Sequence, residues 1–175
     1  MVQETKKLTA SSESTAFTGI ATLCNYVLWH DEKWSQNKLI EYHTAVTEYD
    51  RKFYDGEITI EQMSKRLWDK AGFTIEYVPQ AEEDTYLKNK FFRDMEQRTI
   101  KAGNIINEMS QQYLLIYFNV LMDSGYGKKR LNRVKDNLNK WLDITSKDTG
   151  KKIMDLHREL VDKVGIYVEM PDIRR

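Results

Sequence analysis

Apolar residues recur along the chain at the three- and four-residue spacing that marks one face of an α-helix. In the first half this pattern predicts three helices, one beginning near Phe17, one capped by Ser35 and one capped by Thr59. Thr59 and Gln62 have the spacing of a capping box. The third helix should end at Gly72, because a left-handed glycine commonly terminates a helix.

After Gly72 the pattern changes from helical spacing to alternation. Residues 73–78 alternate apolar and polar positions and stop at Pro79, which predicts a short strand. Residues 166–170 have the same pattern and stop at Pro171. Because one short strand is not stable by itself, we expect the two strands to pair as a β-ribbon.

The segments that lead into these strands are similar to each other. Residues 67–76 and 160–169 are identical at Leu67/Leu160, Asp69/Asp162, Lys70/Lys163, Gly72/Gly165 and Glu76/Glu169. Self-similarity of this length predicts one folding unit used twice. We therefore divide the chain into a flexible polar tail (1–14), a first repeat (15–79), a charged helical connector (80–109) and a second repeat (110–171).

Each repeat would contain three helices and a strand, so the expected fold is all-α with a minor two-stranded β-ribbon. A pseudo-two-fold axis would relate the two repeats. Exchange of strands between protomers would satisfy the same strand edges, which makes a homodimer the alternative. Aromatic residues gather in the first repeat, and we name Trp29, Trp34 and Tyr42 as a candidate interface.

Composition limits the class of protein. Basic and acidic residues number 27 each, so any contact with nucleic acid would have to depend on a local basic patch. The mean hydropathy of -0.65 and the lack of a long apolar stretch predict no contact with a membrane interior. The single cysteine, Cys24, excludes an internal disulfide and favours a reducing, cytoplasmic location.

The strongest local signal is a basic turn flanked by glycines. Its residues are Gly125, Tyr126, Gly127, Lys128, Lys129, Arg130, Arg133 and Lys135. Glycines let a backbone approach a ligand closely, and the start of a helix favours an anion. The segment is either a binding surface for phosphates or acidic protein, or a tight helix–turn–helix connection with a solvated basic face. The corresponding turn in the first repeat, residues 31–38, lacks the glycines and the basic cluster, so we expect binding only in the second repeat.

Patterns that would indicate catalysis or metal binding are weak. His30, His43 and His157 lie on different expected helices and lack the spacing of converging ligands, so no metal or other cofactor is predicted. No nucleophile is accompanied by a positioned base. The recurrent Asp69 and Asp162 are explained more simply as charged residues near helix ends. We therefore expect no enzyme activity and name no catalytic residue.

The segment from Gly125 to Leu131 resembles a group of short, uncharacterised proteins from phages and prophages of Gram-positive bacteria, many of which carry Gly-Phe/Tyr-Gly-Lys-Lys-Arg-Leu. Some of them also carry a Thr-Ile-Glu segment like residues 59–61. The resemblance implies a phage protein in the cytoplasm of its bacterial host. Small phage proteins without catalytic motifs usually act by binding. We expect inhibition or modulation of a host protein or nucleoprotein complex, for example a defence system such as CRISPR, with a DNA- or RNA-binding phage regulator as the alternative.

Overall fold

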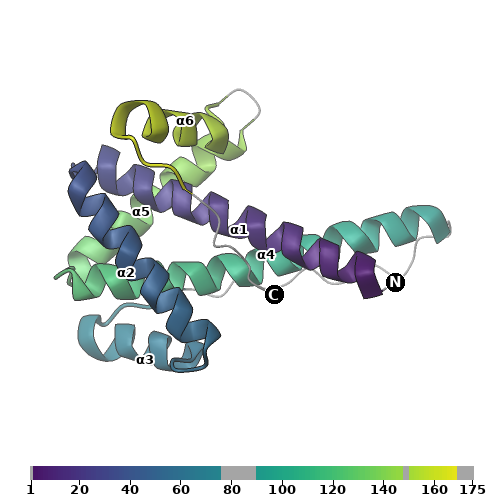
Figure 1. Cartoon of the computed structure of the whole chain (residues 1–175), viewed down its shortest axis with the longest axis horizontal. Coiled ribbons are helices and arrows are strands. Elements are labelled where there is room, and N and C mark those ends of the chain that lie inside the picture. Colours follow the sequence, from purple (N-terminus) through teal and green to yellow (C-terminus); the bar gives the residue numbers. More distant parts are fainter. Residues whose placement is uncertain (1, 76–89, 148–149, 169–175) are drawn as a thin grey trace.

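Six α-helices make up the regular structure in the described part of the chain. The computed structural model describes residues 2–75, 90–147 and 150–168, and the side chains of 16–75, 104, 106–147 and 150–168. The helices are α1 (Val2–His30), α2 (Gln36–Tyr54), α3 (Ile60–Ala71), α4 (Lys90–Asp123), α5 (Lys128–Ser146) and α6 (Ile153–Val164) (Figure 1). This confirms the all-α class. Among the described residues, no helix has the length and apolar character needed to cross a bilayer.

The two longest helices differ from the prediction in where they begin. α1 begins at Val2, so most of the expected flexible tail is helical. Residues 2–18 contain no glycine or proline and include several good helix formers, which explains the continuation. α4 runs through Gly103 without a break and joins much of the expected connector to the first helix of the second half. Both helices extend beyond the other four (Figure 1).

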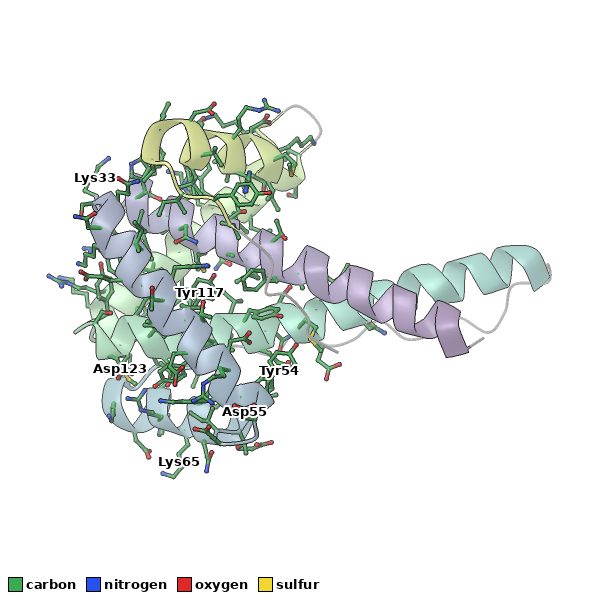
Figure 2. The ribbon with its side chains drawn as sticks, in the orientation of Figure 1. Lys33, Tyr54, Asp55, Lys65, Tyr117 and Asp123 are labelled. Atoms are coloured by element: carbon green, nitrogen blue, oxygen red, sulfur yellow. The ribbon has the colours of Figure 1, made fainter. Side chains whose placement is uncertain are left out.

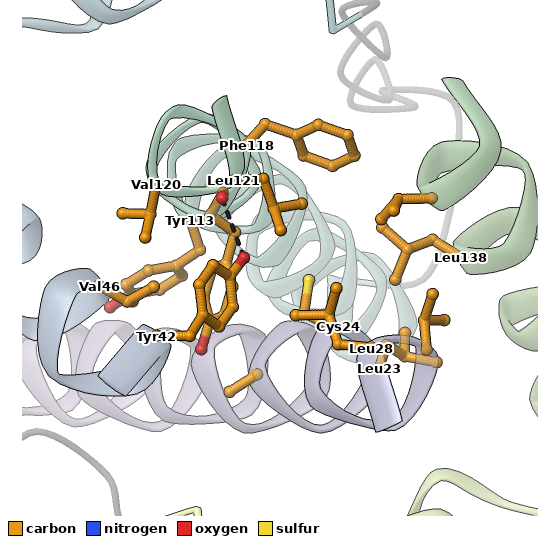
Figure 3. Packing of buried hydrophobic residues seen from close by; sticks show 14 of the residues in the cluster. Leu23, Cys24, Leu28, Tyr42, Val46, Tyr113, Phe118, Val120, Leu121 and Leu138 are labelled. Atoms are coloured by element: carbon orange, nitrogen blue, oxygen red, sulfur yellow. Dashed lines mark hydrogen bonds between the residues drawn. The ribbon is translucent and has the colours of Figure 1, made fainter. Parts of the chain in front are cut away.

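The short helices of each half pack on the long helix of the other half. α1 and α4 lie against each other at the centre, α2 and α3 pack mainly on α4, and α5 and α6 pack mainly on α1 (Figure 1). Figure 3 shows this core, where Leu28 of α1, Val46 of α2 and Leu121 of α4 are buried. The hydroxyl of Tyr42 on α2 donates to the carbonyl oxygen of Tyr117 on α4 at 2.9 Å.

A polar cluster fixes α3 on α4. The guanidinium of Arg66 forms two hydrogen bonds with the carboxylate of Asp123, at 2.5 and 3.0 Å. The Tyr49 hydroxyl donates to the same carboxylate at 2.9 Å. The buried amide of Asn119 donates to the carbonyl oxygen of Met63 at 3.2 Å. These contacts come from α2, α3 and α4 and satisfy the polar groups that the packing brings together.

A second cluster fixes α5 and α6 on the end of α1. The hydroxyl of Tyr26 donates to Glu159 of α6 at 3.2 Å, and Glu159 also pairs with Lys151. The indole N–H of Trp141 on α5 donates to Asp31 at 2.9 Å. Each end of the molecule therefore joins two short helices to one long helix through side-chain hydrogen bonds.

The helix ends largely follow the sequence prediction. Ser35 caps α2, and Thr59 with Gln62 forms the capping box of α3. Gly72 and Gly165 end α3 and α6 with φ angles of 57° and 69°, in the left-handed region that glycine tolerates. These boundaries are set by a few neighbouring residues, which explains why the sequence pattern predicts them.

The predicted strands are not seen in the described residues. Residues 73–75 and 166–168 have no regular secondary structure, and residues 76–78 and 169–170 lie outside the described residues. Phe73, Ile166 and Val168 are buried, and the Phe73 ring stacks on Phe118 with a centroid distance of 4.9 Å. Over the described residues, the alternation therefore reflects apolar side chains that pack on helices rather than a strand pair.

Candidate functional site: a basic cleft between two turns

The predicted basic turn joins α4 to α5. Gly125 has a φ of 87°, a left-handed conformation that explains the glycine. The backbone N–H of Tyr126 donates to the carbonyl oxygen of Leu121 at 3.1 Å, which closes the turn. Gly127 occupies the N-cap position of α5 and supplies no side-chain cap. The Tyr126 side chain is buried, so the turn directs this ring inward and leaves the basic residues of the next helical turn exposed.

The turn between α1 and α2 has a similar backbone, although it contains no glycine. Lys33 takes the left-handed position with a φ of 59°. The N–H of Trp34 donates to the carbonyl oxygen of Leu28 at 2.9 Å, as Tyr126 does in the other turn. A side chain in the left-handed region costs roughly 1–2 kcal/mol, and such local strain is concentrated at functional sites. The first turn thus reaches a similar backbone without the glycines that the second turn contains.

The two turns contact each other directly. The indole N–H of Trp34 donates to the hydroxyl oxygen of Tyr126 at 2.9 Å, across 92 residues of sequence. The Tyr126 hydroxyl in turn donates to the carboxylate of Glu32 at 3.1 Å. Arg133 of α5 forms two hydrogen bonds with the same carboxylate, at 2.6 and 2.5 Å. A chain of hydrogen bonds thus joins the two turns and engages both oxygens of Glu32.

The charges of this network follow from its contacts. The hydrogen bonds from Arg133 are the main cause that lowers the pKa of Glu32 below its usual range, against the opposing effect of burial. Burial is the main cause that raises the pKa of Tyr126. At neutral pH Glu32 is therefore a carboxylate and Tyr126 a protonated donor. The Glu32 side chain is only 4% exposed, so its charge is compensated inside the network.

A surface cleft of about 460 Å³ opens over this network. Its lining residues are Glu32, Lys33, Trp34, Ser35, Lys38, Tyr126, Arg130 and Arg133. We call this the basic cleft. Since Arg133 is paired with Glu32, three cations remain in the cleft without an ion pair in the described part of the chain, namely Lys33, Lys38 and Arg130.

Two of these cations lie over aromatic rings. The Lys38 ammonium is 4.0 Å from the centroid of the Trp34 ring, and the Arg130 guanidinium carbon is 5.4 Å from that of Tyr126. Lys38 and Arg130 are each the third residue of their helices, α2 and α5. The cleft therefore has two similar walls, and each wall carries one cation held on one ring.

The other predicted basic residues do not all belong to the cleft. Lys128 and Lys129 are exposed in the first turn of α5, and Lys128 lies next to Gly72 at the end of α3. The Lys135 ammonium is 5.7 Å from the centroid of the Phe73 ring. Lys128 and Lys135 thus neighbour the segment that follows α3, and the structure does not gather the predicted residues on one surface.

The candidate aromatic interface is mostly internal. Trp34 and Tyr42 are 5% and 3% exposed, and their rings meet edge to face with centroids 5.4 Å apart. Trp29 is partly buried against Tyr26, with a centroid distance of 5.6 Å. Because an interface needs accessible side chains, we assign Trp34 and Tyr42 to the core beneath the basic cleft.

Sequence reasoning missed Glu32, Lys33 and Lys38, because it required glycines in the first turn. A usable signal was present. In both turns an aromatic residue immediately precedes the N-cap, and a basic residue follows three positions after the N-cap. The spacing of these two residues relative to the cap marks the turn better than the glycines do.

The described residues include the side chains that the sequence analysis considered for catalysis or metal binding. They contain no group of three or more histidine, cysteine, aspartate or glutamate side chains that could hold a metal ion. Asp69 and Asp162 are exposed and lie on α3 and α6, which are on opposite sides of the molecule in Figure 1. Cys24 is buried, and burial raises the pKa of its thiol. A thiol in this environment is inert.

Scans against protein-family models, curated proteins and solved structures find no match to this chain.

Proposed function

We propose that this chain is a non-catalytic binding protein of phage origin that acts in the host cytoplasm on a host protein or nucleoprotein complex, for example a defence system such as CRISPR. The observation that carries the proposal is the convergence of Lys33, Lys38 and Arg130 on one cleft in a chain with zero net charge. The phage origin is supported by the resemblance of the Gly125–Leu131 segment.

The form of the cleft favours binding over chemistry. Both oxygens of its carboxylate, Glu32, accept hydrogen bonds from Arg133, and Tyr126 donates to one of them. A general base must be able to take a proton from a substrate, and a carboxylate engaged in this way is poorly suited to do so. Free cations at an open surface are suited to an acidic partner.

A DNA- or RNA-binding regulator is the second candidate. The tight turn between α4 and α5 has the form of a helix–turn–helix connection, and Lys129 and Lys140 are exposed on α5. Asp136 and Asp143 are exposed on the same helix, which weakens its attraction for phosphates. Binding to nucleic acid should fall steeply with salt, by roughly tenfold or more between low and physiological ionic strength.

The test is capture of partners from lysate of a Gram-positive host, with and without nuclease, by the tagged chain and by Lys38→Glu/Arg130→Glu. We expect a partner that survives nuclease treatment and is lost with the double variant. Lys65→Glu is the control, because Lys65 points away from the molecule on α3, far from Lys33 (Figure 2). A partner lost with nuclease supports the regulator instead. Equal capture by the double variant and by the Lys65→Glu control would exclude the basic cleft as the contact surface.

The same proposal includes duplication of one ancestral unit. Its support is that α2 and α5 both have 19 residues, α3 and α6 both have 12, and a left-handed residue precedes the aromatic residue in the turns before α2 and α5. In such an arrangement a pseudo-two-fold axis passes near the contact between Trp34 and Tyr126. Each half then finds its partner within the chain, which favours a monomer over the strand-exchanged homodimer.

A further inference from the structure

We propose that the basic cleft recognises a short acidic segment of the partner protein, with one carboxylate on Lys38 over Trp34 and a second on Arg130 over Tyr126. The inference rests on the proposed function and adds the chemistry of the partner to it. It also makes the turn between α1 and α2, which carries no glycine, one half of the site.

Lys38 and Arg130 each lie where a positive charge interacts unfavourably with the dipole of its own helix. The N-terminus of a helix carries partial positive charge, so a cation in its first turn is unfavourable and an acid is favourable. α3 and α6 follow this rule, with Glu61 and Asp155 in their first turns. α2 and α5 have no acid there, and instead carry Lys38 and Arg130. An anionic ligand between the two helix starts would remove this repulsion.

The aromatic rings prepare the cations for binding. Lys38 and Arg130 are exposed side chains with many rotamers, and ordering them opposes binding. Their positions over Trp34 and Tyr126 restrict that freedom before a ligand arrives. Because the two rings are joined by a hydrogen bond, the two cations are also fixed relative to each other.

The bottom of the cleft is formed by an ion pair, which leaves the cations at its rim to contact an anion. Glu32 repels a second carboxylate, but its charge is compensated by the two hydrogen bonds from Arg133. Arg133 is therefore occupied by Glu32. Lys33, which also lines the cleft, adds a third positive charge to those of Lys38 and Arg130. The cleft thus presents three cations close together, above polar groups that are already hydrogen-bonded to each other.

This form fits a short acidic peptide better than nucleic acid. Trp34 and Tyr126 are 5% and 4% exposed, so bases of a single strand would find no open ring on which to stack. A duplex presents one charge about every 1.7 Å along its axis and needs a long basic track. Exposed acids follow the cations on both helices, at Glu41 of α2 and Asp136 of α5, and confine the positive surface.

Titration by NMR with short synthetic peptides tests the inference. The probes are peptides with two glutamates at varied spacing, the same peptides with glutamine, and single- and double-stranded DNA oligonucleotides. The reporter is the indole N–H resonance of Trp34, which donates to Tyr126 beneath the cleft. We expect saturable shifts with at least one glutamate peptide and none with its glutamine version. DNA that binds more tightly than every glutamate peptide overturns the inference.

Single variants then separate the two walls. We expect Lys38→Gln and Arg130→Gln each to weaken the glutamate peptide by about fivefold, the value of one exposed ion pair of about 1 kcal/mol. Lys65→Gln should bind like the native chain. Both cleft residues are exposed, so circular dichroism should show unchanged folding. If Lys38→Gln binds the glutamate peptide with native affinity, the inference that both walls bind a carboxylate is overturned.

The two levels of the proposal fail in different ways. In one case Lys38→Gln binds peptide normally, while a nuclease-resistant partner is still lost with Lys38→Glu/Arg130→Glu. The proposed function then stands, and the inference that both walls bind a carboxylate fails. If the peptides bind as expected but lysate yields no partner, the chemistry of the cleft stands and the proposed function fails.

Discussion

Asp50 on α2 is a carboxylate placed where its charge is unfavourable. It is 8% exposed, and its Oδ1 atom lacks a hydrogen-bond partner in the described part of the chain. Burial raises its pKa to about 6. An aspartate in the unfolded chain titrates near pH 3.9, so the folded state holds this proton more tightly. The resulting stabilisation is complete below about pH 4 and is lost as the pH rises through about 6.

Asp50→Asn should therefore stabilise the chain near neutral pH. We expect the free energy of unfolding to rise by about 2 kcal/mol at pH 7, because a neutral amide avoids burying the charge, and to match the native value near pH 4. Urea unfolding across pH 4 to 7 measures this difference. The half-buried His43 is present in both chains, so its titration cancels. The exposed Asp162→Asn is the control and should change stability by less than about 0.5 kcal/mol. A difference that does not vary with pH would contradict the assignment.

Which aromatic residue reaches the surface could not be predicted from local sequence. Trp34 precedes a helix N-cap, a position compatible with exposure, yet it is buried because Tyr126 from the other half covers it. Lys33 was equally hard to identify, since its left-handed backbone normally indicates glycine. Both residues depend on contact between the two turns, which the sequence pattern of either turn does not contain.

At the scale of elements, helix ends were predictable because their causes are local. The Thr59–Gln62 capping box and the glycines at 72 and 165 each act within one turn of helix. The strand predicted after Gly72 fails over residues 73–75 because Phe73 packs on Phe118 of α4 rather than in a ribbon. Alternation of burial has more than one structural cause, whereas a left-handed glycine that ends a helix has few.

Replacement of glycine by alanine should have opposite effects at helix ends and within a helix. Gly165→Ala should cost about 1–2 kcal/mol of stability, because its φ is 69° and a Cβ there would lie 3.0 Å from Nε2 of Gln36. Gly72→Ala should cost about 1 kcal/mol for its left-handed backbone alone, because an added Cβ would lie 3.7 Å from the nearest atom, Nζ of Lys128. Gly19→Ala, inside α1 with open space around it, should add about 0.5–1 kcal/mol. Urea unfolding of the three variants measures these values, and a loss of stability in all three would contradict the backbone argument.

At the scale of the whole molecule, the two halves are interleaved. α2 and α3 cover α4, and α5 and α6 cover α1, so each half completes its core with a helix from the other. The sequence similarity between residues 67–76 and 160–169 indicates two units, but it carries no information on which long helix each unit covers. That choice depends on long-range packing and became visible only in the structure (Figure 1).

Interleaving predicts that neither half folds alone. A chain of residues 1–79 would expose Leu39, Met63 and Leu67, which are fully buried in the intact molecule, and a chain of residues 80–175 would expose the equivalent face of α5 and α6. Because most helix stability comes from packing of the apolar face, each fragment should show low helicity by circular dichroism and no cooperative unfolding. An equimolar mixture should recover the helicity of the intact chain, and light scattering should show one fragment of each kind per particle. Cooperative unfolding of either fragment by itself, or a fragment homodimer, would mean that the halves are separate units and that the cleft between their turns forms only by docking.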